Sequence, residues 1–542
     1  MKNTLYKRFS GKFICFLLLV LIVAGLNSCK DEFFERESSP TLEFTNIGEA
    51  EMGIFSPYQK FVQGSDKSPL WMVNFMHFGM CDIVREIGQN GYNDVYSRST
   101  SNQITAVDNL FSPSFQIISS CNYMIDYLEK DPFEGISESD KVNNQNRLIG
   151  EAYFLRGHTY LQLALFFCPA YDAGGQNDSK ILPLRNQFAS TMETALNNQP
   201  VETSQIYDLI VADLTKAKEL LPKKKGDGMN TSYQYGRATK HAAMSVLAKV
   251  YMLMGKYDEA LAELNGVLGD SEVSRALLSD PKSCFLNNSS SPWTDSEIVW
   301  YGNFADPALS VTTSYRHPND YNWFMNYTFP LVNTYQEWWI WALNKETLQR
   351  VGIMNADGTE TNAWKADKRK ALYKRFEGFV ANTTLVKGRP TLSSNSFQGF
   401  VGAKDPVYIA NKFFLVPDSA NYKNTFQNIP IIRSAELYLM RAGIKALKSL
   451  GGQAADLNVV RNRSWNASIG GAYQLLTDAQ VSWDVVDNEW VKEMAFESDR
   501  VLWLQLFKKP IGPGTRNVSS INAPYADFYW PILQSEVDFQ DN

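Results

Sequence analysis

The segment Ala242–Leu268 (AAMSVLAKVYMLMGKYDEALAELNGVL) is the part of the sequence that most constrains the fold. Small residues stand where two helices would pack together, and Gly255, Lys256 and Tyr257 supply a turn. An amphipathic pattern with the helical period resumes at Asp258. The segment therefore predicts two helices joined by a tight turn, and such a pair needs neighbours against which to bury its apolar faces.

Neighbouring helices are predicted on both sides of this pair. Residues 148–166 place apolar side chains on one helical stripe, which we interpret as core. Residues 204–221 form a second helical pattern, in which Ser204 occupies the expected N-cap position and the helix stops at a proline. Residues 432–450 predict a further helix. The pair at 242–268 resembles one tetratricopeptide repeat, a unit that is stable only in a stack. We therefore expect a mainly α fold on a tetratricopeptide-like helical repeat scaffold.

The composition changes in residues 291–416, where helical periodicity fades and Asn, Gly, Thr, Pro and aromatic residues dominate. Seven of the 13 tryptophans lie in this segment: Trp293, Trp300, Trp323, Trp338, Trp339, Trp341 and Trp364. Three of them, Trp338, Trp339 and Trp341, are so close together that we assign them to packing, because exposing all three would create a large apolar patch. We interpret the segment as an irregular, loop-rich insertion for ligand binding, since loops on a rigid scaffold are where binding function usually resides.

The N-terminus predicts a membrane address. Four basic residues precede the apolar run Phe13–Ala24, which is followed by Leu26, a tolerant position, a small residue and Cys29. This order is typical of a bacterial lipoprotein signal peptide, here residues 1–28. Cys29 is then the lipidated first residue of the mature chain, and residues 29–45 form a polar tether. The triplet at 30–32 (KDE) resembles the signal that sends lipoproteins to the outer face of the outer membrane.

Composition excludes several classes of protein. An apolar content of 44% and a charged content of 20% are those of a folded globule. The formal net charge is -6, and residues 1–28 carry four basic and no acidic residues, so the mature chain stands near -10. This balance argues against nucleic acid and acidic lipid as partners. The body of the chain contains four cysteines, namely Cys81, Cys121, Cys168 and Cys284. Their spacing is not that of a zinc site, and whether two of them form a disulfide is left open by the sequence.

Signatures of catalysis are scarce. The four histidines have no HExxH or other metal spacing, and the chain has neither a GxSxG elbow nor a phosphate-binding GxxxxGK loop. His158 and His241 lie on predicted helices and are interpreted as packing or capping residues. The sequence therefore predicts a protein that is not an enzyme, with no catalytic residue, cofactor or metal site. Calcium at a loop aspartate stays open, without an EF-hand spacing to support it. A glycosidase pair stays open as an alternative, because its defining feature is the spatial separation of two carboxylates.

Two polar, aromatic stretches are candidates for ligand binding, residues 89–98 and 317–324. A site for sugars needs flat aromatic side chains against C–H-rich faces and planar polar groups for neighbouring hydroxyls. The predicted stacking residues are Tyr92, Tyr96, Tyr321 and Trp323. The predicted hydrogen-bonding residues are Asn93, Asp94, Arg98 and Asn322.

Several blocks of the chain resemble, in the expected order, the sequence pattern of the SusD/RagB family of outer-membrane nutrient-binding lipoproteins. The blocks are Glu151–Gly157, Ile206–Asp208, Gly236–Lys240, Ile431–Arg433, Leu457–Arg463, Glu493–Leu504 and Trp530–Glu536. Three positions depart from the pattern: Cys168 and Ser498 replace frequent glycines, and Gln505 stands where basic residues are frequent. We interpret these positions as structural, so the departures concern the subfamily more than the fold.

The resemblance implies a tetratricopeptide-like platform with a loop-rich ligand face, and a SusC-like TonB-dependent transporter as partner. We therefore predict a non-catalytic lipoprotein on the exterior of the outer membrane that binds oligo- or polysaccharide and delivers it to that transporter. Residues 46–270 would form the N-terminal SusD-like region and residues 271–542 the C-terminal SusD/RagB region. Alternatives are a lipid-anchored surface glycoside hydrolase, and a peptide-binding or structural adaptor of the same architecture.

Overall fold

The computed structural model describes residues 43–63, 68–86, 93–99, 105–191, 194, 199–286, 296–303, 341–376, 385–386, 389–390, 406–412, 428–497, 499–533 and 536. By its internal contacts the chain divides into residues 1–49 and residues 50–542. Of the first unit the structure describes residues 43–49, where helix α2 (Ile47–Gly53) begins. The second unit contains the helical scaffold and the sheets.

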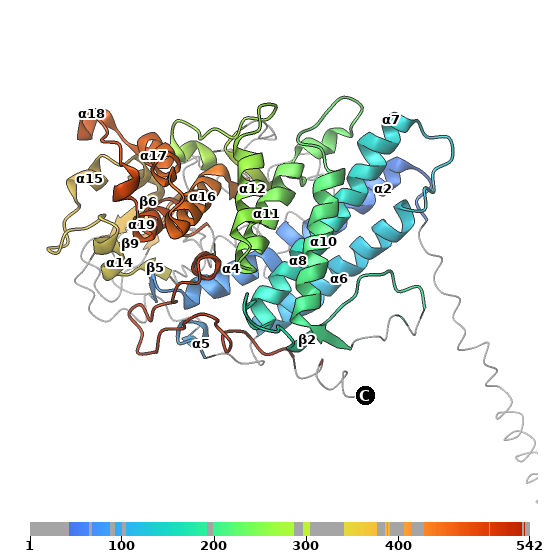
Figure 1. Ribbon diagram of the computed structural model, residues 1–542, viewed down its shortest axis with the longest axis horizontal. Coiled ribbons are helices and arrows are strands. Elements are labelled where there is room, and N and C mark those ends of the chain that lie inside the picture. Colours follow the sequence, from blue (N-terminus) through green and yellow to red (C-terminus); the bar gives the residue numbers. More distant parts are fainter. Residues whose placement is uncertain are drawn as a thin grey trace, which may run out of the picture. The chain divides into compact units, whose positions relative to one another are not determined.

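The second unit is built on long helices packed side by side (Figure 1). They are α4 (Pro69–Met80), α6 (Thr105–Leu128), α8 (Arg147–Phe167), α10 (Thr203–Leu220), α11 (Lys240–Leu253), α12 (Tyr257–Leu268), α16 (Ser434–Lys448), α17 (Gln453–Ser464) and α19 (Trp483–Met494). From α6 onward each packs on the next in the order α6, α8, α10, α11, α12 and α16, and α16 then packs on both α17 and α19. The predicted mainly α scaffold is confirmed.

Short helical segments connect or flank these helices. The α-helical ones are α3 (Phe55–Tyr58), α5 (Asn93–Tyr96), α7 (Glu138–Asp140), α14 (Lys345–Arg350), α15 (Asn362–Lys365), α18 (Ala467–Gly470) and α20 (Arg500–Leu506). Single turns of other helix types are η2 (Gln59–Gln63), η4 (Lys141–Asn146), η5 (Thr231–Gln234), η6 (Pro281–Phe285), η8 (Lys368–Leu372) and η11 (Asp478–Gln480). None of the helices in the described part of the chain is long and apolar enough to cross a membrane.

The contact between α8 and α10 depends on small residues and one buried ion pair. Gly157 of α8 faces α10 so closely that an added Cβ would lie 3.0 Å from Cβ of Asp213. One residue earlier, Arg156 donates through Nε and Nη2 to the two carboxylate oxygens of Asp213, each at 2.7 Å. A buried bidentate pair of this kind fixes the register of two helices more tightly than apolar packing alone.

Two helix starts differ from the predicted positions. Helix α10 begins at Thr203, because Glu202 is the N-cap and forms a capping box with Gln205, two residues before the predicted Ser204 cap. Before α16, residues Ile429–Arg433 form strand β10, so the helix starts at Ser434 instead of 432. The backbone of these residues pairs with strand β4 (Ile298–Gly302). The helical pattern could not indicate this pairing, because the partner strand is distant in the chain.

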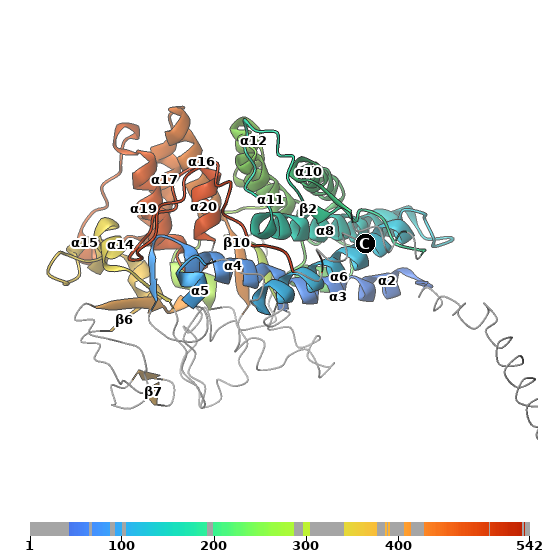
Figure 2. The ribbon, with the colours of Figure 1, turned by 90° about the horizontal axis from the view of Figure 1, so that it is seen from below.

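The strands are short and lie largely within the predicted insertion. Strands β1 (Val84–Glu86), β5 (Trp341–Leu343), β9 (Val407–Ala410) and β6 (Tyr373–Phe376) form one antiparallel sheet in that order. Three two-stranded sheets pair β10 with β4, β2 (Lys180–Pro183) with β3 (Pro200–Glu202), and β7 (Leu385–Val386) with β8 (Arg389–Pro390). Figure 2 shows β6 and β7 on one side of the helices α16, α17 and α19. The described part of the insertion thus confirms short elements on a helical base.

A network of buried charges joins these sheets to the helices. Arg433 at the end of β10 is 1% exposed and forms ion pairs with Glu297, Glu493 and Glu497. Arg463 of α17 contacts Glu297 at 2.9 Å and Glu493 at 2.6 Å. Because buried charges are tolerated only when they are paired, the network ties β4, β10, α17 and α19 into one arrangement.

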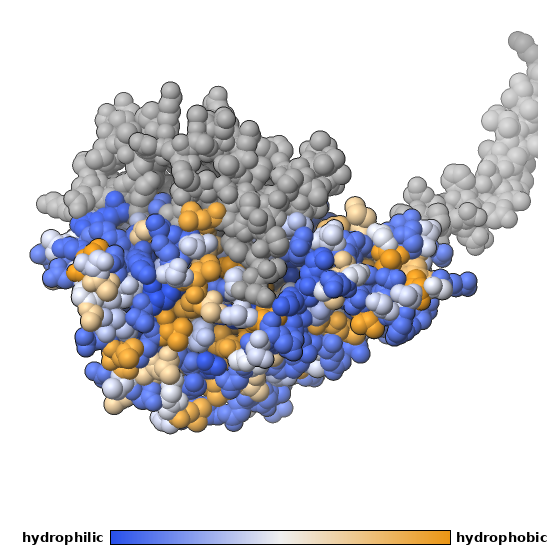
Figure 3. Space-filling view, turned by 90° about the horizontal axis from the view of Figure 1, so that it is seen from above, coloured by the Kyte–Doolittle hydropathy of each residue, from blue (hydrophilic) through white to orange (hydrophobic). Residues whose placement is uncertain are grey.

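The four cysteines of the second unit are buried free thiols in this structure. Burial raises the pKa of the Cys81 and Cys168 thiols to about 12, so both stay protonated at neutral pH. The disulfide that the sequence left open is therefore not formed. Hydrophilic residues cover most of the described surface in Figure 3, with apolar residues in small groups between them.

A glycine-to-alanine substitution tests the packing of α16 on Phe507, the residue that follows α20. At Gly443 an added Cβ would lie 2.5 Å from Cζ of Phe507, a ring that is itself held 4.7 Å from Trp503. We expect Gly443→Ala to lower the free energy of unfolding by about 1–3 kcal/mol, because the ring cannot move aside. Urea unfolding of the soluble chain measures this.

The matched control is Gly266→Ala in α12. There the added Cβ would meet only the terminal methyl of Met244, the end of a flexible side chain. We expect no loss, since alanine is favoured over glycine in helices by about 0.5–1 kcal/mol. Equal destabilisation by the two substitutions would contradict the packing argument.

Candidate functional site

The two strands that flank the candidate stretches in the chain pair with each other. Residues 89–98 follow β1 and residues 317–324 precede β5. Strands β1 and β5 are antiparallel neighbours in which Glu86 and Trp341 face each other. The end of β1 and the start of β5 therefore lie at one end of the same sheet. Glu86 and Trp341, more than 200 positions apart, are neighbours in this sheet, which no local pattern could predict.

Tyr96 packs against this anchor point. Its ring lies 5.9 Å from that of Trp341 at an interplanar angle of 27°. The guanidinium of Arg516 lies 4.2 Å from the Tyr96 ring centre, and the Tyr96 hydroxyl shares a 2.8 Å hydrogen bond with Thr515. Helix α4 comes close enough here that a Cβ at Gly79 would lie 2.6 Å from the Trp341 indole. Tyr96 thus helps to hold α5 on the scaffold, and the predicted packing role of Trp341 is confirmed.

Arg98 pins the C-terminal segment. Its guanidinium donates to the carbonyl oxygens of Met80 at 2.9 Å and Gly512 at 2.5 Å, with longer contacts to Ile511 and Ser519. Burial, followed by the charge of Arg516, lowers the Arg98 pKa to about 10, so the side chain stays charged at neutral pH. Its donors are engaged by backbone carbonyls, and a contact with ligand stays a prediction.

The other predicted site residues fall into two groups. Asp94 is exposed on α5, and Asn93 is the first residue of that helix. Five predicted site residues lie outside the described residues: Cys29, Tyr92, Tyr321, Asn322 and Trp323. The predicted roles of all these residues stay predictions, as do the signal peptide 1–28, the tether 29–45 and the regional boundary after residue 270.

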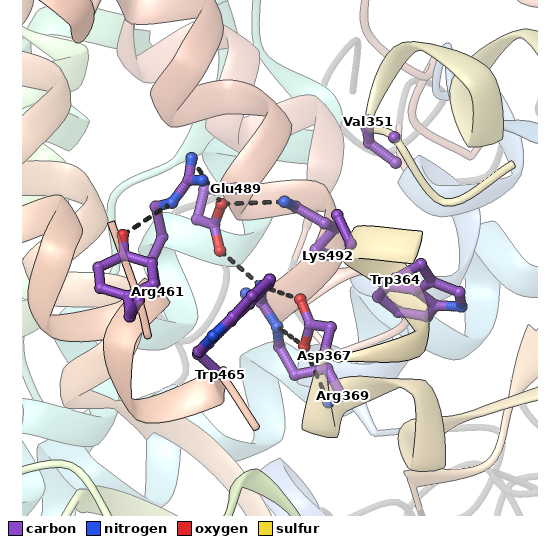
Figure 4. Close-up of a pocket in the computed structure, with 11 residues that line it drawn as sticks. Val351, Trp364, Asp367, Arg369, Arg461, Trp465, Glu489 and Lys492 are labelled. Carbon is purple, nitrogen blue, oxygen red and sulfur yellow. Dashed lines mark hydrogen bonds and ion pairs between the residues drawn. The ribbon is translucent and has the colours of Figure 1, made fainter. Parts of the chain in front are cut away.

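A pocket of about 110 Å³ opens between the short helices of the insertion and the pair α17 and α19 (Figure 4). It is lined by Val351, Gly352, Ala363, Trp364, Asp367, Arg369, Arg461, Trp465, Tyr473, Glu489 and Lys492. A backbone bridge between Asp367 and Trp465 joins the two sides. Trp465 and Tyr473 are half-buried, and the indole N–H of Trp465 donates to the Gly471 carbonyl at 2.8 Å. The pocket therefore offers aromatic surface beside charged groups.

Glu489 is the carboxylate at the centre of this pocket. It lies 2.6 Å from Arg369, 3.1 Å from Lys492 and 3.7 Å from Arg461. Burial raises its pKa, but the charge of Arg369 and then those of Lys492 and Arg461 outweigh this and lower the pKa to about 2. Glu489 is therefore ionised at neutral pH, and it is held by three cations from α17, α19 and η8.

Two of these cations, Arg461 and Lys492, have N–H groups that form no hydrogen bond among the described residues. The Nε of Arg461 donates to the Tyr473 hydroxyl at 3.1 Å, but its Nη1 is too far from Glu489 for a hydrogen bond, at 3.7 Å. Lys492 has Glu489 as its one ion-pair partner among the described residues. Sequence reasoning missed Trp465 and Tyr473 and noted Arg461 only as part of a block that resembles the family. The available signal was an aromatic pair within the Asn-, Ser- and Gly-rich run at 464–473.

The histidines take the packing roles that were predicted for them. His158 is buried in α8 between Phe61, Phe154 and Trp300. His241 in α11 accepts a hydrogen bond from Arg275. Within the described residues, no group of three or more His, Cys, Asp or Glu side chains could hold a metal ion.

Two family models match the chain. The model SusD-like, described as starch-binding and associating with the outer membrane, matches residues 83–252. The model of the SusD family matches residues 353–506. Together they include α6, α8, α10 and nearly all of α11 before the insertion, part of the insertion, and α16, α17, α19 and α20 after it. A search of curated proteins found none that matches the chain.

Solved structures share the fold. A SusD superfamily protein from Bacteroides thetaiotaomicron VPI-5482 is 17% identical with a TM-score of 0.66, over 91% of this chain and 98% of its own. A laminarin-binding SusD-like protein is 19% identical with a TM-score of 0.62, over 92% and 98%. A SusD-like carbohydrate-binding protein from Bacteroides vulgatus ATCC 8482 is 16% identical with a TM-score of 0.60, over 86% and 85%. The overall fold is therefore common to these proteins.

Proposed function

We propose that this chain, which belongs to the SusD/RagB family, captures glycans at the cell surface without transforming them and delivers them to a TonB-dependent outer-membrane transporter. Glycan capture is the part with most support, since fold relatives are named as laminarin-binding and carbohydrate-binding proteins. Delivery to a SusC-like transporter follows from the family resemblance. The lipidated Cys29 would anchor the chain to the exterior of the outer membrane.

The observation that carries the proposal is the pairing of β1 with β5. It brings the end of β1, which precedes 89–98 in the chain, next to the start of β5, which follows 317–324 in the chain, with Glu86 opposite Trp341. Because loops on a rigid scaffold often carry binding function, we expect side chains of both stretches to contact one sugar chain. The tight packing around Tyr96 and Trp341 gives this end of the sheet the rigidity that a preformed site needs.

The first experiment is a titration of the soluble chain, beginning at Lys30, with a panel of glycans and peptides. Calorimetry or tryptophan fluorescence follows binding, and chromatography of the mixtures detects products. Saturable glycan binding without products supports capture. Product formation would favour a surface hydrolase and overturn the non-catalytic role, and binding of peptides alone would favour the adaptor reading.

Aromatic variants locate the site. We expect Tyr321→Ala and Trp323→Ala each to weaken glycan binding, because each removes stacking surface worth about 1.5–3 kcal/mol, which corresponds to roughly 10–100-fold in affinity. The control is Tyr438→Ala, which removes a half-buried tyrosine on α16 outside both stretches. Unchanged affinity in both loop variants would place the glycan elsewhere.

A further inference from the structure

Two cations of the pocket around Glu489 have hydrogen-bond donors that are not used. Its two lining carboxylates form ion pairs with Arg369, to Asp367 and to Glu489, each at 2.6 Å, and the one oxygen of Glu489 without a hydrogen-bond partner among the described residues, Oε1, is buried. Among the described residues, no acceptor lies within hydrogen-bond distance of Nη1 or Nη2 of Arg461. The Lys492 ammonium has three donors and one ion-pair partner. The unused donors of Arg461 and Lys492 therefore favour a ligand group that offers acceptors.

The charge of the lining agrees with this preference. It comprises the cations Arg369, Arg461 and Lys492 against the carboxylates Asp367 and Glu489. Figure 4 shows the guanidinium of Arg461 and the ammonium of Lys492 on either side of the Glu489 carboxylate. Both cations reach solvent, with 30% and 16% of their side chains exposed. Guanidinium and ammonium groups bind carboxylates and sulfates through charge-assisted hydrogen bonds.

Aromatic surface lies next to these donors. The N–H of Trp465 is already satisfied by Gly471, so its half-buried ring contributes apolar surface only. Tyr473 lies beside it, with ring centres 6.1 Å apart. At about 110 Å³ the pocket is smaller than the roughly 300–1,000 Å³ typical of small-molecule sites. It therefore fits the charged end of one sugar unit, not a whole oligosaccharide.

We propose that this pocket binds the anionic group of an acidic sugar, either a uronate carboxylate or a sulfate ester, with the sugar ring against Trp465. The inference extends the glycan-capture proposal by naming a charged sugar as ligand. It concerns a second site, built from residues outside 89–98 and 317–324, so the two proposals can fail separately.

The test titrates the soluble chain with galacturonate, galactose 6-sulfate, galactose and sodium sulfate, followed by calorimetry. We expect saturable binding of at least one acidic sugar and at least tenfold weaker binding of galactose and of sodium sulfate. Absence of binding by both acidic sugars would overturn the proposal. So would equal binding of galactose, or sodium sulfate binding as tightly as the sugars, which would indicate an adventitious ion only.

Variants assign the binding to the pocket. Arg461→Gln and Lys492→Gln should each weaken acidic-sugar binding about tenfold, the usual effect of losing a hydrogen bond to a charged group. Lys448→Gln, which removes a solvent-exposed cation of α16, should leave it unchanged. Circular dichroism checks that each variant folds, and Lys492→Gln carries the test if Arg461→Gln does not. Unchanged affinity in Lys492→Gln would overturn the assignment.

The loop variant Trp323→Ala separates this inference from the capture proposal. Acidic-sugar binding at the pocket should persist in Trp323→Ala, while glycan binding at the loops should persist in Lys492→Gln. Loss of acidic-sugar binding in Trp323→Ala would place that ligand on the loop face and overturn the second site.

Discussion

Arg433→Met is expected to lower the free energy of unfolding by about 3–5 kcal/mol. Arg433 is 1% exposed and contacts three buried carboxylates, those of Glu297, Glu493 and Glu497. Methionine fills much of the same volume but leaves these negative charges close together with fewer counter-charges. The carboxylates cannot be rehydrated without opening the junction of β4, β10 and α19, so the cost appears in stability.

A surface pair provides the control for this prediction. Lys448 contacts Asp258, whose side chain is 79% exposed. Lys448→Met should cost no more than about 1 kcal/mol, because water screens an exposed pair and replaces its contacts. Urea unfolding of both variants at pH 7 measures the difference. Similar small losses in the two variants would mean that the Arg433 network contributes nothing beyond a surface ion pair.

Lowering the pH from 7 to 5 is expected to remove about 4 kcal/mol of stability through two buried histidines. The pKa of His158 is lowered to about 3 and that of His241 to about 4, against an unfolded value of about 6.5. Below pH 6.5 the unfolded chain binds protons that the folded chain does not. Stability therefore falls by about 1.4 kcal/mol per pH unit for each histidine, or about 2 kcal/mol each at pH 5.

The physical causes differ between the two rings. Burial lowers the His158 pKa first, followed by the nearby charge of Lys249, and its Nδ1 has no hydrogen-bond partner among the described residues. Burial also dominates at His241, where Arg275 donates from Nε to Nδ1 at 3.0 Å. That hydrogen bond needs the lone pair of the neutral His241 ring. The attraction of Asp270 for the protonated ring raises the His241 pKa and so offsets part of the lowering.

The variant His158→Phe tests the pH dependence. Its site is lined by aromatic rings, with Phe61 at 5.0 Å and Trp300 at 5.4 Å, so an uncharged ring fits there. Urea unfolding at pH 7, 6 and 5 should show about half the wild-type loss. Glu489 does not contribute in this window, because its lowered pKa costs stability only as the pH falls below about 4.5. An unchanged slope in His158→Phe would contradict the assignment.

The local sequence pattern predicted those helices whose bounds are set by residues within or next to the helix itself. The helical period and the turn at Gly255 placed α11 and α12 correctly. The N-cap of α10 was predicted two residues too late, because Glu202 and Gln205 cap the helix reciprocally and the apolar period does not show which polar residue is the cap. The strand before α16 was missed, since β10 exists only through its pairing with β4.

The candidate site was only partly predictable. Composition identified residues 89–98 and 317–324 as candidates. The proposal that they form one site depends on the pairing of β1 with β5, which the sequence did not indicate. Tyr96 and Arg98 also proved to be scaffold contacts. The pocket around Glu489 is assembled from four separated segments, so no single stretch of sequence carried its signature.

The sequence by itself determined the helical scaffold, the family and the expected membrane address. Each of these depends on residues close together in the chain or on motifs in a fixed order. Only the tertiary structure decided which charges meet in the core, as at Arg433, and which donors remain unused at the Glu489 pocket. The reason is physical: hydrogen bonds and ion pairs act over a few ångströms, and only folding brings segments from opposite ends of the chain within that range.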